Sequence, residues 1–357
     1  MMINPNIFLY ASTDGLVCWN FKDHKQFLLN HDYAARLIAI ACGGTSIDLN
    51  NPIDRDLYSA ELASSKFISP AHWGWDPLSR IFHIGTRDIP ILDIPRDVTE
   101  WAKLYLAHCE KALEKPFPAE NCVEYSDQGL NLPLAEDTGW FDKLLSKRMT
   151  VRSFLGNPIP LMKLSKLLKY SLGFMPHREK SCDTDIPNHF RNRRCSASGG
   201  GLNSTEGYIY ANHVEGLPRG IYYYNPHRHT LHFIEKNLPE LGSLLSGQHF
   251  ANEISVGIFL TSRLDKLWWK YSHSRAYRMA LVEIGHIAQT FQLYACELGL
   301  GTWLTGALNE NSIESLLKLR NPSEQPMFFV GAGHTDGSHT PAALIQLTNK
   351  NLTNFQK

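Results

Sequence analysis

The sequence lacks an excess of charge of either sign. Its 357 residues include 35 lysines and arginines and 35 aspartates and glutamates, so the formal net charge is zero. A protein that binds a nucleic-acid backbone or an anionic membrane surface usually carries a clear excess of positive charge. The composition therefore gives no support to either kind of partner, and we expect no nucleic acid and no membrane.

Paired cysteines and long apolar runs are missing as well. The seven cysteines are odd in number and scattered, and no two of them form a C-x-x-C pair. We therefore expect reduced thiols in a cytoplasmic protein without a metal site. His177, Cys182 and His189 form a loose array, but their spacing fits no standard ligand pattern. No apolar run is long enough to span a bilayer, and no signal peptide is evident at the N-terminus.

A dinucleotide-binding fingerprint is also absent. Gly299, Gly301 and Gly306 do not have the G-x-G-x-x-G spacing, and no clear strand leads directly into them. We therefore expect no Rossmann-type nicotinamide site in this chain.

What is present is ample for a buried core, since 43% of the residues are hydrophobic. We expect an N-terminal helical, winged-helix-like module over 1–113, a polar, proline-containing linker over 114–140, and a second domain over 141–357. In the module, the apolar spacing predicts a strand over 16–21 and helices over 33–42, 53–67, 78–83 and 101–113.

The second domain mixes both kinds of periodicity. Helices are predicted over 141–147, 161–172 and 274–298, and a further helix that Asn309 or Asn311 would cap. Strands are predicted over 208–210, 220–224, 230–234, 254–260 and 327–333, with a hairpin turn between the second and third of these. The tail over 342–357 reads as an arm.

A glycine run gives the first hint of a site. Gly199, Gly200 and Gly201 remove every Cβ from a short stretch of backbone, so the main chain can approach a flat or anionic ligand closely. Ser196 and Ser198 add hydroxyls beside the run. A surface loop or hinge without any ligand has the same composition, so the run alone does not decide.

A second hint is the stretch around Arg148, Thr150 and Arg152. These residues alternate, so in an extended backbone their side chains share one face. Two guanidiniums that flank a hydroxyl suit a phosphate or a ribityl chain, because arginine offers forked donors. A solvated basic edge would show the same spacing.

The third hint is the adjacent pair Lys270 and Tyr271. A lysine in a partly apolar pocket has a lowered pKa, as a general base requires. Without other support, such a pair is usually one solvated cation and one half-buried ring.

Four stretches occur in the same order as in one known family: Arg148-x-Thr150-x-Arg152, Ala197-Ser198-Gly199-Gly200-Gly201-Leu202 with Glu206, Lys270-Tyr271 before Glu283-Ile284-Gly285-His286, and Gly299-Leu300-Gly301 with Thr305-Gly306-Ala307. Through them the region 141–333 resembles the nitroreductase-like flavoproteins. Within that family it resembles the SagB-type dehydrogenases, which are the azoline oxidases of thiazole- and oxazole-modified natural-product pathways.

The resemblance implies an α+β fold with a central mixed or antiparallel sheet flanked by helices, and FMN at a homodimer interface. The N-terminal module would be the family's variable extension. Lys270 and Tyr271 match the family's catalytic pair. The positions implied to bind the cofactor are Arg148, Thr150 and Arg152 for the phosphate and ribityl chain, Ser198, Gly199, Gly200 and Leu202 along the ring, and Gly301, Gly306 and Ala307 towards its reactive nitrogen.

The match has departures. Ala197 stands where the family usually has proline, Met149 replaces a frequent polar or basic residue, and no obvious arginine or lysine follows Gly333. These differences bear on the phosphate contacts more than on the fold.

Three functional readings stay open. The first is oxidation of a thiazoline or oxazoline on a peptide or carrier-bound intermediate, with a cyclodehydratase or synthetase as a partner. The second is an NAD(P)H-dependent nitro- or quinone reductase. The third is a non-catalytic docking subunit of a biosynthetic complex.

Overall fold

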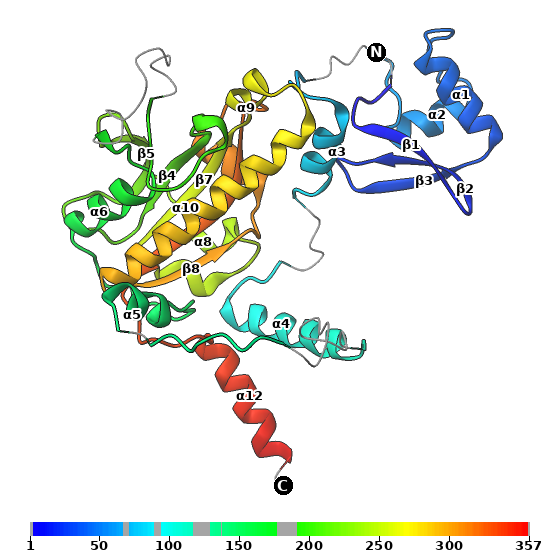
Figure 1. The fold of residues 1–357 in the computed structure, drawn as a ribbon. Helices are drawn as coiled ribbons and strands as arrows, with labels where there is room; N and C mark the ends of the chain where they lie inside the picture. The colour runs from blue at the N-terminus through cyan, green and yellow to red at the C-terminus, as the bar shows by residue number, and fades with distance from the viewer. Residues whose placement is uncertain are drawn as a thin grey trace. The chain divides into compact units, whose positions relative to one another are not determined.

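The structure is a computed structural model that describes residues 3–66, 71–88, 94–116, 129–136, 138–176 and 191–355. The chain divides into two compact units (Figure 1). Unit 1 consists of Met1–Pro90 and Leu264–Tyr277, and unit 2 consists of Ile91–Arg263 and Arg278–Lys357. A segment from the second half of the chain therefore belongs with the N-terminal residues. The predicted limits of module, linker and second domain stay a prediction.

Unit 1 contains a three-stranded antiparallel sheet in the order β1 (Ile7–Ser12), β2 (Gly15–Asn20) and β3 (Lys25–Leu29). Its described residues also form the α-helices α1 (His31–Ala41), α2 (Pro52–Ser59), α3 (Pro77–Gly85) and α9 (Leu264–Lys270). Cys18 from the sheet packs with Leu37, Ile40 and Leu57 of α1 and α2 in one buried cluster.

The predicted strand 16–21 and the helices over 33–42 and 78–83 are confirmed. The helix predicted over 53–67 is too long, because α2 ends at Ser59 and Glu61 adopts a left-handed φ of 58°. Phe67, the last residue of that prediction, lies outside the described residues. The sequence pattern does not predict β1 and β3, which flank β2.

Unit 2 is built on a six-stranded sheet in the order β6-β5-β4-β7-β9-β8, and all five neighbouring pairs are antiparallel. The strands are β4 (Thr205–Ala211), β5 (Gly220–Asn225), β6 (Thr230–Glu235), β7 (Val256–Arg263), β8 (Gly301–Thr305) and β9 (Glu324–Gly333). The predicted β5–β6 hairpin and the strands β4, β7 and β9 are confirmed; β8 is an additional edge strand.

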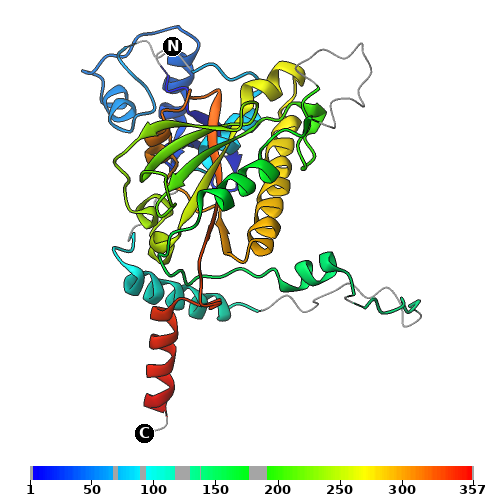
Figure 2. The ribbon, with the colours of Figure 1, turned by 90° about the vertical axis from the view of Figure 1, so that its left-hand side faces the viewer.

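Helices cover both faces of this sheet. On one face lie α6 (Leu161–Ser171) and α10 (Tyr277–Glu297) (Figure 2). Their residues Leu164, Ile287 and Phe291 belong to one buried cluster with residues of the strands. On the other face, α8 (Leu241–Leu244) and α11 (Glu310–Leu317) pack against aromatic residues of β4, β7 and β9. The described part of unit 2 also contains α4 (Val98–Leu113), α5 (Trp140–Lys147) and α12 (Ala342–Phe355), and α12 contacts α4.

The long helix α10 follows from its spacing. Ala280, Ile284, Ile287, Phe291 and Ala295 recur at steps of three and four and are all buried. The same spacing predicts a buried Leu281, but 45% of that side chain's surface is exposed. This end of α10 thus carries a second apolar face, which the described residues leave largely exposed.

Candidate active site

The glycine run forms a single 3₁₀ turn, Gly199–Gly201, directly before β4. Gly200 has φ 62° and Gly201 has φ 70°, values that glycine adopts with little strain. The backbone N–H of Leu202 donates to the carbonyl of Gly199 and closes the turn. Gly200 is exposed, so the turn presents main chain without side chains to its surroundings.

A buried polar network attaches this turn to α10. The hydroxyl of Ser198 donates to Glu283 Oε2 at 2.6 Å and accepts from the backbone N–H of Asn203 at 2.8 Å. The second oxygen, Glu283 Oε1, accepts from the backbone N–H of Thr205 at 2.8 Å. The Ser198 side chain is therefore engaged by the protein and holds the turn in place.

Arg194 completes the network. Its Nη1 lies 4.0 Å from Glu283 Oε1, and both side chains are 2% exposed. The same guanidinium donates to the carbonyls of Leu172 and Thr205. Burial lowers the pKa of Arg194, and the carboxylates of Glu206 and Glu283 oppose that shift. Glu283 enters the sequence motif only as the first residue of Glu283-Ile284-Gly285-His286, although it lies three residues after Ala280 and four before Ile287, on the buried face of α10.

The segment with Arg148, Thr150 and Arg152 is extended, as its alternation predicts. Thr150 forms a parallel bridge with Thr302 of β8, and the backbone N–H of Val151 donates to the Thr302 carbonyl at 3.0 Å. Val151 is buried, whereas the three alternating residues are half-buried. Arg148 Nη1 donates to Thr150 Oγ1 at 3.3 Å, so these groups form one polar face.

Gly301, which begins β8, and Gly306, which follows β8, have different environments. A Cβ on Gly301 would come within 2.5 Å of Thr335 Cγ2 and 2.7 Å of Val151 Cγ2, so the absent side chain makes room for packing. Gly306 and Ala307 are exposed after the other end of β8, where the backbone N–H of Ala307 donates to Thr305 Oγ1 at 3.0 Å.

The two polar segments lie at opposite ends of α10 within one chain. Glu283 holds the glycine turn near the start of the helix, and Gly301 with the Arg148 segment follows the helix end at Glu297. From Glu283 to Glu297 the helix rises about 21 Å. A single chain therefore presents the glycine turn and the arginine segment at separate places.

Lys270 and Tyr271 lie in unit 1, at the end of α9. Lys270 is exposed, and its Nζ lies 5.6 Å from the centroid of the Tyr271 ring. The described residues of unit 1 thus leave the Lys270 amine outside the apolar pocket that a general base would need. Tyr271 is half-buried, and its carbonyl accepts from Trp75 Nε1 at 2.7 Å.

Comparison with known families decides the class of the protein. A model described as the Nitroreductase family matches residues 145–334, just over half of the chain. The chain belongs to the nitroreductase family. The match contains the Arg148 segment, the glycine turn, Lys270-Tyr271 and β8. It confirms the predicted α+β nitroreductase-like fold, and it makes this protein a nitroreductase-family oxidoreductase.

Two relatives illustrate the range of this similarity. The candidate nitroreductase MJ1384 of Methanocaldococcus jannaschii is 29% identical over 206 residues, which are 57% of this chain and 95% of that protein. The trifolitoxin-processing protein TfxB of Rhizobium leguminosarum bv. trifolii is 28% identical over 176 residues, or 46% of this chain and 44% of TfxB. The second match thus spans less than half of either protein.

Solved structures show lower identity. A candidate nitroreductase from Ralstonia eutropha JMP134 aligns with a TM-score of 0.46 and 21% identity, and the alignment covers 62% of this chain and 97% of that one. A chain of the E. coli microcin synthetase McbBCD complex with truncated pro-MccB17 bound aligns with a TM-score of 0.48 and 19% identity over 86% of this chain and 95% of that one.

The described part of this nitroreductase-family chain has neither a metal-binding cluster nor a membrane-crossing helix. Among those residues, no group of three or more His, Cys, Asp or Glu side chains is arranged to hold a metal ion. No helix among them combines the length and apolarity that crossing a membrane requires. His177, Cys182 and His189 lie outside the described residues.

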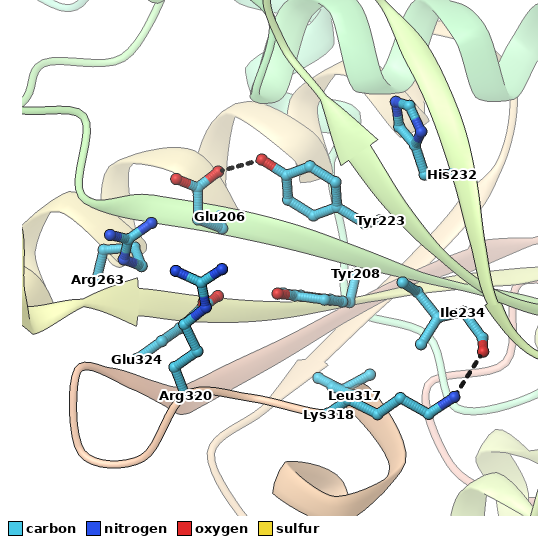
Figure 3. Close-up of a pocket in the computed structure, with 10 residues that line it drawn as sticks. All are labelled: Glu206, Tyr208, Tyr223, His232, Ile234, Arg263, Leu317, Lys318, Arg320 and Glu324. Atoms are coloured by element: carbon cyan, nitrogen blue, oxygen red, sulfur yellow. Dashed lines mark hydrogen bonds between the residues drawn. The ribbon is translucent and has the colours of Figure 1, made fainter.

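A polar cavity of about 300 Å³ lies in unit 2, on the sheet face that carries α11 (Figure 3). Glu206 of β4 and Glu324 of β9 line it and are only 7% and 6% exposed. The Tyr223 hydroxyl donates to Glu206 at 3.2 Å, and Thr261 donates to Glu324 at 2.6 Å. None of the predicted site residues lines this cavity.

Burial raises the pKa of Glu324, the nearby charge of Glu206 adds to that shift, and the bond from Thr261 opposes it. The folded state therefore binds this proton more tightly than the unfolded chain, whose carboxyl titrates at its ordinary value of 4.5. As pH rises from that value through the raised pKa, the Glu324 carboxyl must ionise in the fold, and the free energy of unfolding falls.

We predict that Glu324→Gln removes this pH-dependent loss. Urea unfolding at about pH 5 and about pH 8 should show a smaller fall in stability for the variant than for the wild type. Glu297→Gln, which changes an exposed carboxylate on α10, is the control. Equal pH dependence in wild type and Glu324→Gln would contradict the raised pKa.

The buried network predicts a larger effect at Glu283. Glu283→Ala leaves Arg194 without its partner on α10 and should lower the free energy of unfolding by about 3–5 kcal/mol in urea titrations. Glu297→Ala removes an exposed carboxylate from the same helix and should change stability by less than about 0.5 kcal/mol. Equal effects of the two substitutions would show that the network does not hold the turn.

Proposed function

We propose that this protein is an FMN-dependent oxidoreductase that oxidises thiazoline or oxazoline rings to thiazoles or oxazoles on a peptide or carrier-bound intermediate. The observation that carries the proposal is the Lys270–Tyr271 pair, which ends α9 in a segment of its own between β7 and α10. Support for a peptide natural product comes from the similarity to TfxB, which is named for trifolitoxin processing. A cyclodehydratase or synthetase would supply the azoline.

FMN fits the chemistry of the residues that this family resemblance selects. Arg148 and Arg152 offer forked donors to the phosphate, with the Thr150 hydroxyl between them. The exposed turn at Gly200 allows a flat ring to approach the backbone, and Ser198 holds that turn. Leu202 and the exposed Gly306–Ala307 loop complete the proposed lining, while Gly301 packs the Arg148 segment onto β8. FMN supplies the hydride acceptor when bound, and dioxygen is the final oxidant.

We propose further that each cofactor site is shared between two copies of the chain. The glycine turn and the arginine segment lie at opposite ends of α10 in one protomer. Beside the turn, Met279, Leu281 and Val282 of α10 are 39%, 45% and 47% exposed. Exposed apolar residues next to a polar site commonly mark an interface. A two-fold dimer through this face would place the turn of one copy against the arginines of the other.

In the proposed reaction, the azoline ring loses a proton from carbon and a hydride. We assign the proton to the Lys270 amine, acting as a general base, with Tyr271 holding the ammonium that forms against its ring face. Lys270 is exposed, so substrate and neighbouring surfaces must exclude water from the amine for it to act as a base in this reaction.

We predict that Lys270→Ala lowers azoline oxidation by at least about 100-fold, the usual contribution of a general base, and leaves FMN binding intact. Turnover is read as the loss of two hydrogens from an azoline peptide by mass spectrometry under air, and bound FMN by visible absorbance. Lys266→Ala, on the same helix, is the matched control. Unchanged turnover by Lys270→Ala would remove this lysine from the mechanism.

The shared site predicts complementation between two inactive variants. Arg148→Ala with Arg152→Ala removes one half of the site, and Gly200→Val disturbs the other half through its positive φ. A denatured and refolded equimolar mixture should recover about a quarter of the wild-type activity, because half of the dimers are mixed and each mixed dimer holds one intact site. A mixture as inactive as its components would contradict sharing.

A second candidate function is an NAD(P)H-dependent nitro- or quinone reductase. The similarity to MJ1384, which extends over 95% of that protein, favours it. Rapid reduction of the bound flavin by NAD(P)H alone, with no effect of an azoline peptide, would select this function over azoline oxidation.

A further inference from the structure

We infer that Trp75 and Asp76 of the N-terminal residues are positioning residues for Lys270 and Tyr271. The inference rests on the proposed role of Lys270, but the contacts that carry it are independent of that role. Residues 264–277 belong to unit 1 and pack against residues 72–83, almost 200 positions earlier in the chain. Unit 1 would thus act in catalysis through the lysine segment.

Aromatic packing fixes the start of the segment. The Trp268 ring lies 5.8 Å from the Trp73 ring and 5.8 Å from the Trp75 ring, measured between centroids. Gly74, between the two tryptophans, leaves space for Trp268, since a Cβ there would come within 2.2 Å of the indole Cγ. Trp75 is 7% exposed, so this contact is part of the core of unit 1.

A hydrogen bond then reaches the catalytic pair itself. The indole Nε1 of Trp75 donates to the carbonyl of Tyr271 at 2.7 Å. That carbonyl is one peptide unit away from Lys270, so the bond fixes the backbone from which both side chains project. The Lys270 side chain is exposed, and the bond therefore restrains its origin without burying its amine.

Asp76 fixes the other side of the pair. Its carboxylate accepts from the backbone N–H of Ser274 at 3.0 Å and from the Ser274 hydroxyl at 2.5 Å, and it also caps α3 through the N–H of Leu78. These bonds, led by the Ser274 hydroxyl, lower the pKa of Asp76. Beyond them, His83 Nδ1 lies 2.9 Å from the buried Tyr277 hydroxyl. Lys270 and Tyr271 are thus held between two anchors.

The hydrogen bonds of Trp75 and Asp76 should affect the rate of the reaction through the position of the Lys270 amine. A base displaced by about 1 Å loses up to about 100-fold in rate, because proton transfer depends on the alignment of the reacting atoms. Loss of an anchor should therefore lower kcat for azoline oxidation, leave KM for the azoline peptide and the FMN content unchanged, and release the Lys270–Tyr271 bond to proteolysis. A merely structural contact elsewhere in unit 1 would not combine these effects.

The experiment compares two helix caps in the full-length protein. Asp76→Ala and Asn51→Ala each remove the cap of a unit 1 helix that begins with proline, but only Asp76 also bonds Ser274. Trp75→Phe is a third variant, which keeps a ring and deletes the N–H donor. Asp76→Asn retains an acceptor oxygen and is the conservative rescue. Each protein is assayed for kcat, KM and FMN content, and for tryptic cleavage after Lys270 by mass spectrometry.

We expect Asp76→Ala and Trp75→Phe to lower kcat about tenfold and to raise the rate of cleavage after Lys270 about tenfold, since each deletes a hydrogen bond of the segment. Asn51→Ala should change neither, and Asp76→Asn should recover most of the loss. If Lys270→Ala is inactive while Asp76→Ala and Trp75→Phe behave like Asn51→Ala, the inference is overturned and the proposed function stands. Cleavage after Lys270 could also rise in Asp76→Ala and Trp75→Phe while Lys270→Ala oxidises the azoline at the normal rate. In that case the segment has no catalytic role, and the proposed function of Lys270 as a base fails with it.

Discussion

The buried carboxylate of Glu283 is the contact on which the candidate site depends. Its two oxygens accept from the Ser198 hydroxyl and the Thr205 backbone, and Arg194 faces it 4.0 Å away. A charge in this position is costly to bury unless it is paired and hydrogen-bonded, and these contacts hold the turn, β4 and α10 together around it. The exposed glycine turn is thereby fixed to α10, whose inner face is buried in unit 2.

Much of the fold could be predicted from the sequence, because the strongest signals are local. The helix α10 follows from apolar residues at steps of three and four, and the β5–β6 hairpin follows from two aromatic strands around Asn225 and Pro226. The strands β1, β3 and β8 could not be predicted in this way. The five residues of β8 include a glycine, and they are extended because they pair with β9, which is a contact with a distant part of the chain.

The candidate site could be predicted as separate pieces but not as an arrangement. The alternation of Arg148, Thr150 and Arg152 gives their shared face, and the structure confirms an extended segment there. The sequence does not show that Trp75 bonds the Tyr271 carbonyl, because the two residues are 196 positions apart and neither stretch contains a signal for the other. The sequence also does not show that the Ser198 hydroxyl donates a hydrogen bond to Glu283. Because of this bond, the hydroxyl stabilises the glycine turn. The assignments of FMN contacts stay predictions.

The central claim is that two copies of this nitroreductase-family chain bind FMN between the glycine turn of one and the arginine segment of the other. The most direct measurement is the flavin content of the purified protein, by visible spectrum and FMN titration, followed by a crystal structure of that form. The account predicts a yellow dimer with one FMN per chain, its phosphate at Arg148 of one copy and its ring at Gly200 of the partner. A colourless protein that takes up no FMN, or a flavin bound away from both segments, would contradict it.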